Sequence, residues 1–205
     1  QGRSYILDLG ANLECSPAQL SQFALLGSLT TQELDGIAQP RVRLLNVGKE
    51  SSKGNGLIKQ TADLLEAEPL INYCGYVEGD GIFQGSADVV VCDGFSGNVA
   101  LKASEGVARM VSGMVKDLLR RSWLTRLGAA MLGGRMTALR SRLDPAQYNG
   151  AYLLGLNGVT VKSHGGADQI AFGHALDVAI EAAKHNLPDV LSPVLQGKID
   201  HNQTK

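Results

Sequence analysis

The stretch ADVVVCDGFSGNVALKASEG, Ala87–Gly106, decides the fold. Its apolar run ADVVVC predicts a buried strand, and the pattern from Val99 onward predicts a long helix. Between them, DGFSGN predicts a polar loop whose two glycines let the backbone approach a ligand closely. Backbone N–H groups that open a helix, together with the helix dipole, favour an anion. We therefore expect the loop to bind phosphate; a glycine turn with Asn98 as the helix cap is the alternative.

The same order of strand, polar loop and helix occurs twice upstream of this stretch. SYILDLGA (4–11) and RVRLLNVG (41–48) predict strands, and the helices after them are expected at Ala18–Leu29 and Gly56–Glu66. INYCGYVEG (71–79) predicts a further strand. Apolar strands that alternate with helices predict an α/β fold, a mostly parallel sheet with helices on both faces. Ligands of such sheets bind at the carboxyl ends of the strands, where all these loops lie.

The last third of the chain predicts a β-hairpin and a final helix. Two strand-like runs flank Asn157-Gly158, a residue pair that favours a tight hairpin turn. After SHGGAD (163–168), a helix is expected from about Gln169 to His185, ending before Pro188. The polar tail from Gly197 is expected to be frayed.

Composition restricts the classes of function. The chain has 205 residues, 44% hydrophobic and 19% charged, which is enough for a sizeable core. Its net charge of −1 gives no field for nucleic acid, so no nucleic-acid partner is expected. The three cysteines have no metal spacing and are expected to be reduced and buried in a cytoplasmic protein. No metal is expected, and with neither GxGxxG nor a P-loop we expect no cofactor.

Residues 106–143 differ from the rest of the chain in charge and pattern. They contain eight basic side chains and one acidic one, and apolar residues recur at helical spacing. We expect a protruding basic and apolar helical hairpin that contacts an anionic membrane or an acidic protein. A hairpin that only packs on another subunit is the alternative. The candidate contact residues are Arg120, Arg121, Trp123, Leu124, Arg126, Leu127, Met131 and Leu132.

Three further loops carry side chains suited to anion chemistry. Lys53 in KESSKGN can pair with a phosphate oxygen, and His164 in SHGGAD can act as an acid, a base or a hydrogen-bond donor. A solvated lysine and a histidine that ends its strand are the structural alternatives. Asp8 and Asn12 form a weaker fourth loop. Since no GxSxG motif is present, we expect direct attack by bound phosphate on an activated carbonyl rather than a covalent enzyme intermediate.

Six motifs, in matching order over nearly the whole chain, resemble the PlsX family of bacterial phosphate acyltransferases. They are LDLGAN, LLNVG…KGN, INYCGYVEG, DVVVCDGFSGNVALK, QYNGAYLLGL and VKSHGGAD. The resemblance implies transfer of a fatty acyl group from acyl carrier protein to inorganic phosphate, which gives acyl phosphate for phospholipid synthesis. It also implies a fold like isopropylmalate dehydrogenase and phosphotransacetylase, and a homodimer associated peripherally with the membrane.

The resemblance also assigns site residues. It implies that Lys53, Asn98 and His164 are catalytic. The residues expected to bind or shape the phosphate site are Asn55, Asp93, Ser96, Gly97 and Gly165. The family's N-terminal portion is absent from this sequence. We therefore expect residues 1–205 to be a fragment of one α/β catalytic domain, with 106–143 protruding from it.

Two other functions fit parts of the pattern. A phosphate acetyl- or butyryltransferase would use acyl-coenzyme A, but its short, soluble acyl donor needs no apolar hairpin. A non-catalytic membrane scaffold would use the hairpin, but it would not need four polar loops at the strand ends. The acyl donor that supports turnover therefore separates the carrier-protein acyltransferase from the coenzyme A enzyme. Any turnover excludes the non-catalytic scaffold.

Overall fold

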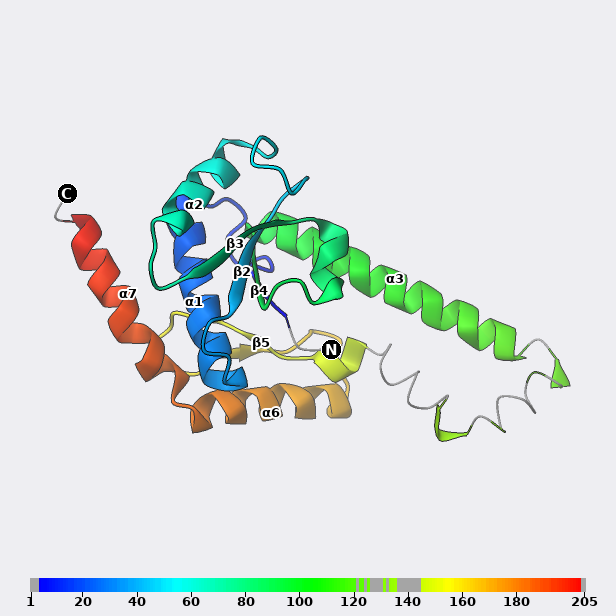
Figure 1. The fold of residues 1–205 in the computed structure, drawn as a ribbon. Coiled ribbons are helices and arrows are strands. Elements are labelled where there is room, and N and C mark those ends of the chain that lie inside the picture. The colour runs from blue at the N-terminus through cyan, green and yellow to red at the C-terminus, as the bar shows by residue number, and fades with distance from the viewer. Residues whose placement is uncertain are drawn as a thin grey trace. The chain divides into compact units, whose positions relative to one another are not determined.

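The computed structural model describes residues 4–120, 122–123, 125, 131, 133–135 and 145–203 (Figure 1). The chain forms two compact units, each described by itself below. The first unit comprises Gln1–Ala100, Leu153–Thr160 and Glu181–Lys205. The second unit comprises Leu101–Tyr152 and Val161–Ile180.

The first unit contains a four-stranded sheet in the order β1-β4-β2-β3. Every neighbouring pair is parallel, so the predicted α/β fold with a parallel sheet is confirmed. The strands are β1 Tyr5–Leu7, β2 Arg41–Leu45, β3 Asn72–Val77 and β4 Val89–Val91. They are shorter than the apolar runs that predicted them, because the last residues of each run belong to the loops.

Both faces of this sheet are covered. On one face α1 (Pro17–Asp35) and α2 (Gly56–Glu66) lie side by side next to β2, as Figure 1 shows, and their leucines pack against the strands. Val90 points to the other face, where the 3₁₀ helix η1 (Gly79–Gln84) and the start of α3 cover it. Burial of each fully buried leucine contributes about 1.5–3 kcal/mol.

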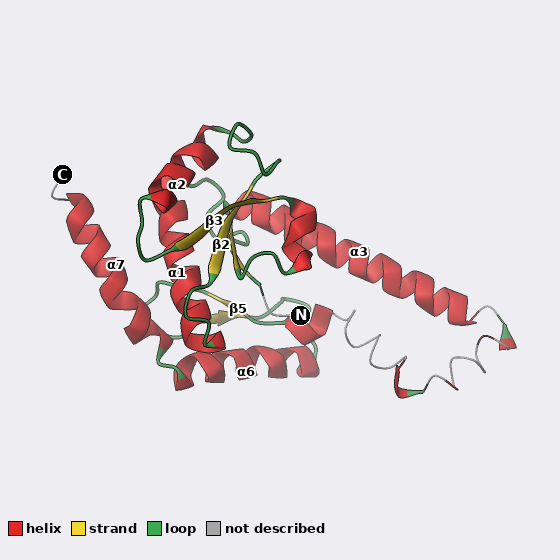
Figure 2. Cartoon of the chain, in the orientation of Figure 1, coloured by secondary structure: helices red, strands yellow, loops and turns green. Residues whose placement is uncertain are grey.

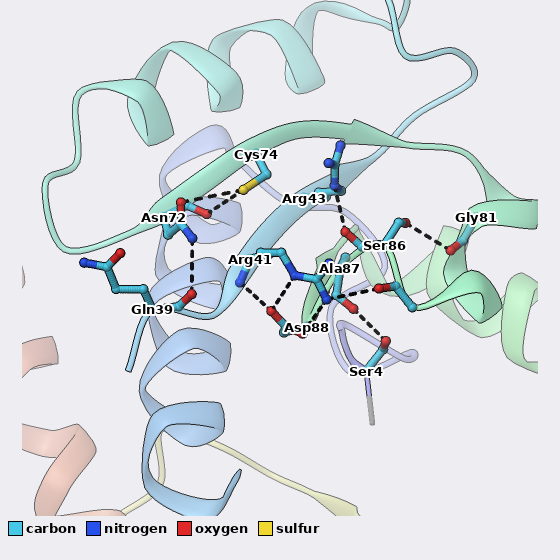
Figure 3. Close-up of polar contacts among 11 residues, drawn as sticks. Ser4, Gln39, Arg41, Arg43, Asn72, Cys74, Gly81, Ser86, Ala87 and Asp88 are labelled. Atoms are coloured by element: carbon cyan, nitrogen blue, oxygen red, sulfur yellow. Dashed lines mark hydrogen bonds and ion pairs between the residues drawn. The ribbon is translucent and has the colours of Figure 1, made fainter. Parts of the chain in front are cut away.

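Side chains at the starts of the strands, here called the amino edge, join the strands to one another (Figure 3). The backbone N–H and the Nε of Arg41 donate to Asp88 Oδ2 at 2.7 and 3.0 Å, and a terminal guanidinium nitrogen donates to Oδ1 at 2.9 Å. The Asn72 side chain donates to the carbonyl of Gln39 at 3.1 Å. The Arg41 guanidinium beside Asp88 lowers the pKa of that carboxyl group, and this outweighs the opposite effect of burial. The amino edge therefore fixes the spacing of β2, β3 and β4.

Helix α3 runs from Gly94 to Arg120 and appears in Figure 2 as one long red helix. DGFSGN was expected to be a loop with the helix starting at Val99, and this prediction is wrong: Gly94–Asn98 form the first turns of α3. The reason is Asp93, whose carboxylate accepts a hydrogen bond from the backbone N–H of Ser96 at 2.8 Å. Asp93 caps the helix, so Asn98 does not.

The strands of the predicted hairpin belong to the second unit, and the connection between them, Leu153–Thr160, belongs to the first. Strands β5 (Ala151–Tyr152) and β6 (Val161–Lys162) pair antiparallel, so the pairing is confirmed. The Leu153 N–H donates to the Thr160 carbonyl at 2.9 Å, and the connection is longer than the two-residue turn expected at Asn157-Gly158. A short 3₁₀ helix, η2 (Pro145–Tyr148), precedes the hairpin.

Two helices end the described chain. The predicted final helix is confirmed as α6 (Gln169–Lys184). A further helix, α7 (Leu187–Gln203), follows, so the prediction of a frayed tail is wrong up to Gln203. Asn186 has a φ of 50° and separates the two helices. Pro188 did not stop the chain's helical structure, because it lies in the first turn of α7, where a proline needs no N–H partner.

Candidate active site

Three loops of the first unit leave one edge of the sheet, here called the carboxyl edge. Strands β1, β4 and β2 are neighbours and parallel, so the segments after Leu7, Val91 and Leu45 start side by side. These segments are the β1 loop (residues 8–12), the start of α3 (93–98) and the β2 loop (46–55). The predicted convergence of these three polar segments at strand ends therefore follows from the observed strand order.

The β1 loop is organised by one carboxylate. Asp8 accepts hydrogen bonds from the backbone N–H groups of Gly10, Ala11 and Asn12 at 3.0, 2.9 and 2.6 Å, and from the Asn12 amide at 2.9 Å. Burial by itself would raise the pKa of Asp8, but these hydrogen bonds outweigh it, and the pKa is lowered. The loop therefore wraps around an ionised carboxylate.

The start of α3 is locked onto the β1 loop by close backbone packing. The Gly94 N–H donates to the Asn12 carbonyl at 2.8 Å. A Cβ built on Gly97 would lie 1.8 Å from the Asp8 carbonyl oxygen. Since only glycine permits this approach, Gly97 is required for contact with the chain's own backbone. This backbone contact is a structural alternative to the expectation that Gly97 makes room for a ligand.

The N–H groups at the start of α3 are partly occupied. Asp93 accepts from the N–H of Ser96 and, at 2.9 Å, from its hydroxyl group. The N–H of Gly94 is bonded to the β1 loop. The expectation that this helix end offers free N–H groups to an anion is therefore wrong for Gly94 and Ser96. Asn98 lies one turn further on, half-buried, and its side chain packs against Gly10.

The β2 loop presents Lys53 at the surface. The buried Asn46 amide donates to the Lys53 carbonyl at 3.4 Å. Gly54 has a φ of 89°, and a Cβ there would lie 2.5 Å from the Asn46 side-chain oxygen. Asn55 caps α2 by accepting from the Ile58 N–H at 3.0 Å. The backbone of Lys53 is thus held near the end of β2, while its side chain is exposed.

His164 lies in the second unit, just after β6. Its backbone N–H donates to the Asn149 side-chain oxygen at 2.8 Å, and its ring Nδ1 accepts from the Gly166 N–H at 3.1 Å. Gly165 is exposed, and a Cβ there would meet nothing within 4 Å. The joint action of His164 and Gly165 with the carboxyl edge of the first unit stays a prediction.

The cysteines offer no reactive thiol at this edge. Burial raises the pKa of Cys92 to about 12 and also raises that of Cys15. Cys92 is buried as expected, whereas Cys15 and Cys74 are only partly buried. Within the described ranges, no group of three or more histidine, cysteine, aspartate or glutamate side chains is placed to hold a metal ion.

The predicted contact segment 106–143 is described only in part. Trp123 and Met131 are 72% and 84% exposed. Arg120 ends α3. The other predicted contact residues, Arg121, Leu124, Arg126, Leu127 and Leu132, lie outside the described residues. None of the described helices is both long and apolar enough to span a bilayer.

Two buried asparagines were missed as candidates. Asn46 and Asn149 are each 9% exposed and bond the chain segments that carry Lys53 and His164. In the sequence, Asn46 directly follows the apolar residues of a strand, and Asn149 directly precedes a glycine. In the structure that glycine, Gly150, has a positive φ. Both patterns are also typical of ordinary turns, so the sequence did not single them out.

Comparison with known proteins places the chain in a family. A family model described as "Fatty acid synthesis protein" matches residues 1–190. The chain is 50% identical over 195 residues, 95% of its length, to a protein named phosphate acyltransferase from Alkalilimnicola ehrlichii. Proteins of the same name from Halorhodospira halophila and Nitrosococcus oceani are 49% and 48% identical over 93% and 99% of the chain. The chain spans 57%, 56% and 59% of the lengths of these three relatives. The chain therefore belongs to the family of fatty acid synthesis proteins, and its motif-based resemblance to the PlsX phosphate acyltransferases is confirmed.

Proposed function

We propose that the protein carrying this chain transfers a fatty acyl group from acyl carrier protein to inorganic phosphate. Membership of the family and the name shared by the relatives support an acyl transfer to phosphate. The observation that carries the proposal is the meeting of the β1 loop, the start of α3 and the β2 loop at one edge of the sheet. Acyl phosphate then serves phospholipid synthesis.

The reaction is a direct displacement. An oxygen of the phosphate dianion attacks the carbonyl carbon of the thioester, and a C–O bond forms. The C–S bond breaks, and the proton of the hydrogen phosphate goes to the departing thiolate. The products are acyl phosphate and the free thiol of the carrier protein. No covalent enzyme intermediate is involved, in agreement with the raised pKa of the Cys92 thiol.

The residues proposed for the site divide into two roles. Lys53 pairs with the phosphate as a point charge, and Asn98 donates a hydrogen bond from its amide. His164 supplies a further polar group from the second unit. The remaining residues shape the phosphate site through backbone and caps: Asn55, Asp93, Ser96, Gly97 and Gly165. The Asp93 carboxylate accepts hydrogen bonds from the N–H and the hydroxyl group of Ser96. The negative charge of Asp93 therefore lies at the start of α3.

The segment 106–143 is the proposed contact for acyl carrier protein and for the anionic membrane surface. Its eight basic side chains would face the acidic surface of either partner. The exposed Trp123 and Met131 add apolar area suited to the headgroup region. We propose a cytoplasmic protein associated peripherally with the membrane. We also propose a homodimer, a state supported by exposed apolar residues of α6 such as Ile170 and Phe172.

The decisive experiment supplies two acyl donors to the intact protein. Long-chain acyl carrier protein and acyl-coenzyme A are each incubated with inorganic phosphate, and acyl phosphate is measured by mass spectrometry. We expect product from the carrier-protein thioester. Product from acyl-coenzyme A alone would move the protein to the acetyl- and butyryltransferases. No product from either donor would leave the membrane scaffold as the better explanation.

Membrane contact is tested by co-sedimentation with vesicles that contain anionic lipid. We expect Trp123→Glu to weaken binding, because it removes apolar area from the interface and adds repulsion. Phe83→Glu is the matched control, since Phe83 is 68% exposed but lies on η1 of the first unit. Equal binding by both variants would remove Trp123 from the membrane contact.

A further inference from the structure

Asn149 is a buried polar residue with an unusually complete set of partners. Its amide nitrogen donates to the carbonyl of Ala171 at 2.7 Å and to the hydroxyl of Ser163 at 2.9 Å. Its side-chain oxygen accepts from the backbone N–H of His164 at 2.8 Å. The side chain is 9% exposed, and it joins the segment before β5 to the end of β6 and the first turn of α6. The loss of such a side chain leaves buried donors and acceptors without partners.

His164 is held at three points. Asn149 accepts from its N–H, the Ala167 N–H donates to its carbonyl at 3.0 Å, and the Gly166 N–H donates to its ring Nδ1 at 3.1 Å. The backbone and one ring nitrogen are therefore fixed by the protein itself. The residue is exposed, and among the described residues no hydrogen bond to its other ring nitrogen, Nε2, is observed, although Glu105 interacts electrostatically with His164. Nε2 is therefore available to a ligand.

The contact with Gly166 also determines which ring nitrogen of neutral His164 carries the proton. A backbone N–H only donates, so Nδ1 must accept with its lone pair and carries no proton. In the neutral imidazole the single ring proton then lies on Nε2. The neutral ring thus presents a hydrogen-bond donor to the solvent side.

We propose that Asn149 is a positioning residue for His164, and that His164 serves the acyl transfer as a hydrogen-bond donor through Nε2 rather than as a base. This inference rests on the proposed function. The acceptor is an anionic oxygen, either of the phosphate or of the thioester carbonyl as negative charge develops on it. The chemistry needs no base at this position, because an oxygen of the phosphate dianion is already a nucleophile.

The first arm of the test compares two substitutions of His164 in the intact protein. In His164→Gln the amide nitrogen falls near the position of Nε2, whereas in His164→Asn it falls near Nδ1. A donor role predicts that the Gln variant retains clearly more activity than the Asn variant, and that the Ala variant loses about 10²–10³-fold. A proton-transferring base predicts that Gln and Asn lose activity equally, and that result would overturn the donor role.

The kinetic constants identify the acceptor. If Nε2 donates to bound phosphate, the Gln and Asn variants raise the KM for phosphate. If it donates to the carbonyl oxygen in the transition state, they lower kcat with little change in that KM. Either pattern supports the donor role, provided that the Gln variant is the more active.

The second arm tests Asn149. We expect Asn149→Ala to lower kcat/KM about 10²-fold through displacement of His164. Ser163→Ala is the matched control, because it removes one partner of the Asn149 amide but leaves the contacts to Ala171 and His164. If the Asn149→Ala protein is folded and as active as the Ser163→Ala protein, Asn149 is not a positioning residue.

A spectroscopic arm is independent of turnover. Long-range ¹H–¹⁵N spectra report the tautomer of each of the four histidines of this chain, and His164→Gln identifies the His164 signal. We expect the Nε2–H tautomer in the wild-type protein and a mixture of tautomers in Asn149→Ala. An Nδ1–H tautomer in the wild type would overturn the inference even if acyl transfer is found. Failure of the wild type to form acyl phosphate would instead count against the proposed function.

Discussion

The two edges of the four-stranded sheet use polar side chains in opposite ways. At the amino edge they bond across strands: Arg41 and Asp88 are 47 residues apart in sequence and share three hydrogen bonds (Figure 3). At the carboxyl edge the bonds are mostly local, as in the four that Asp8 accepts from three residues of its own loop, Gly10, Ala11 and Asn12. Cross-strand bonds fix the sheet, whereas local bonds shape loops that leave Lys53 exposed and Asn98 half-buried. One edge thus supplies stability, and the other carries Lys53 and Asn98, the groups proposed for chemistry.

The largest expected effect is at the carboxyl edge, where a substitution should lower activity without lowering stability. We expect Lys53→Ala to lower kcat/KM by about 10²–10³-fold, because it removes a positive charge from the phosphate site. Its melting temperature is expected to stay near that of the wild type, since the Lys53 side chain is exposed. Lys59→Ala, on the exposed surface of α2, is the control and is expected to retain activity. Retained turnover in Lys53→Ala would remove this lysine from the mechanism.

At the carboxyl edge, the position where a substitution is expected to affect stability most is Gly97. We expect Gly97→Ala to destabilise the protein by about 3 kcal/mol, because the new methyl group cannot fit against the Asp8 carbonyl. Urea unfolding measures the change. Gly106→Ala, in the same helix with open space around it, is expected to stabilise by about 0.5–1 kcal/mol. Similar midpoints for both variants would mean that α3 does not pack on the β1 loop as described.

At the amino edge the expected effect is on stability alone. Asp88→Ala removes the acceptor of the Arg41 backbone N–H and Nε and leaves the guanidinium with only the Gly85 carbonyl, at 3.0 Å, which is expected to cost about 2 kcal/mol. The KM and kcat of the folded protein are expected to stay unchanged. Asp63→Ala on the exposed face of α2 is the control, with little change in stability expected. A large catalytic defect in folded Asp88→Ala would contradict the division of roles between the edges.

The smallest expected effect is a pH dependence common to both edges. The pKa values of Asp8 and Asp88 are lowered in the folded protein from the ordinary value of 3.8. Each carboxylate therefore stabilises the fold fully above that value, and the contribution is lost as the pH falls below it. Asp88→Asn and Asp8→Asn are expected to flatten the loss of stability in acid, Asp88→Asn more so because Asp88 is buried. Stability curves measured between pH 5 and pH 2.5, that is over roughly the acid range of carboxylates, test this.

The sequence predicted those features that follow from local patterns. The bounds of α2 agree with the predicted Gly56–Glu66, because the helix has a buried apolar face that includes Ile58 and Leu65, and Asn55 caps its start. The pairing of β5 with β6 was also predicted, from two apolar runs around a turn. The start of α3 was missed, because DGFSGN reads equally as a loop or as a helix turn capped by Asp93. Helix α7 was missed because Pro188 was taken as a stop signal.

Long-range contacts account for what the sequence did not reveal about the site. The motif DGFSGN predicted that Gly97 is needed, but it did not reveal that Gly97 packs against the backbone of Asp8, 89 residues upstream. Nothing near Asn149 in the sequence indicates that its amide meets both Ser163 and Ala171. Such residues look like ordinary turn residues until the packing brings their partners together.

The strand order has a consequence for the order of folding. Strands β2 and β3, with α2 between them, are near in sequence and can pair early, since short connections cost little chain entropy. Strand β1 pairs only with β4 in the described sheet, and its loop is completed by Gly94 and Gly97. The pairing of Tyr5 with Val89 therefore joins residues that are 84 positions apart in the sequence, and it costs more chain entropy than the pairing of β2 with β3. The contact between the β1 loop and the start of α3 depends on that long-range pairing, whereas α2 and its neighbouring strands are joined by shorter connections.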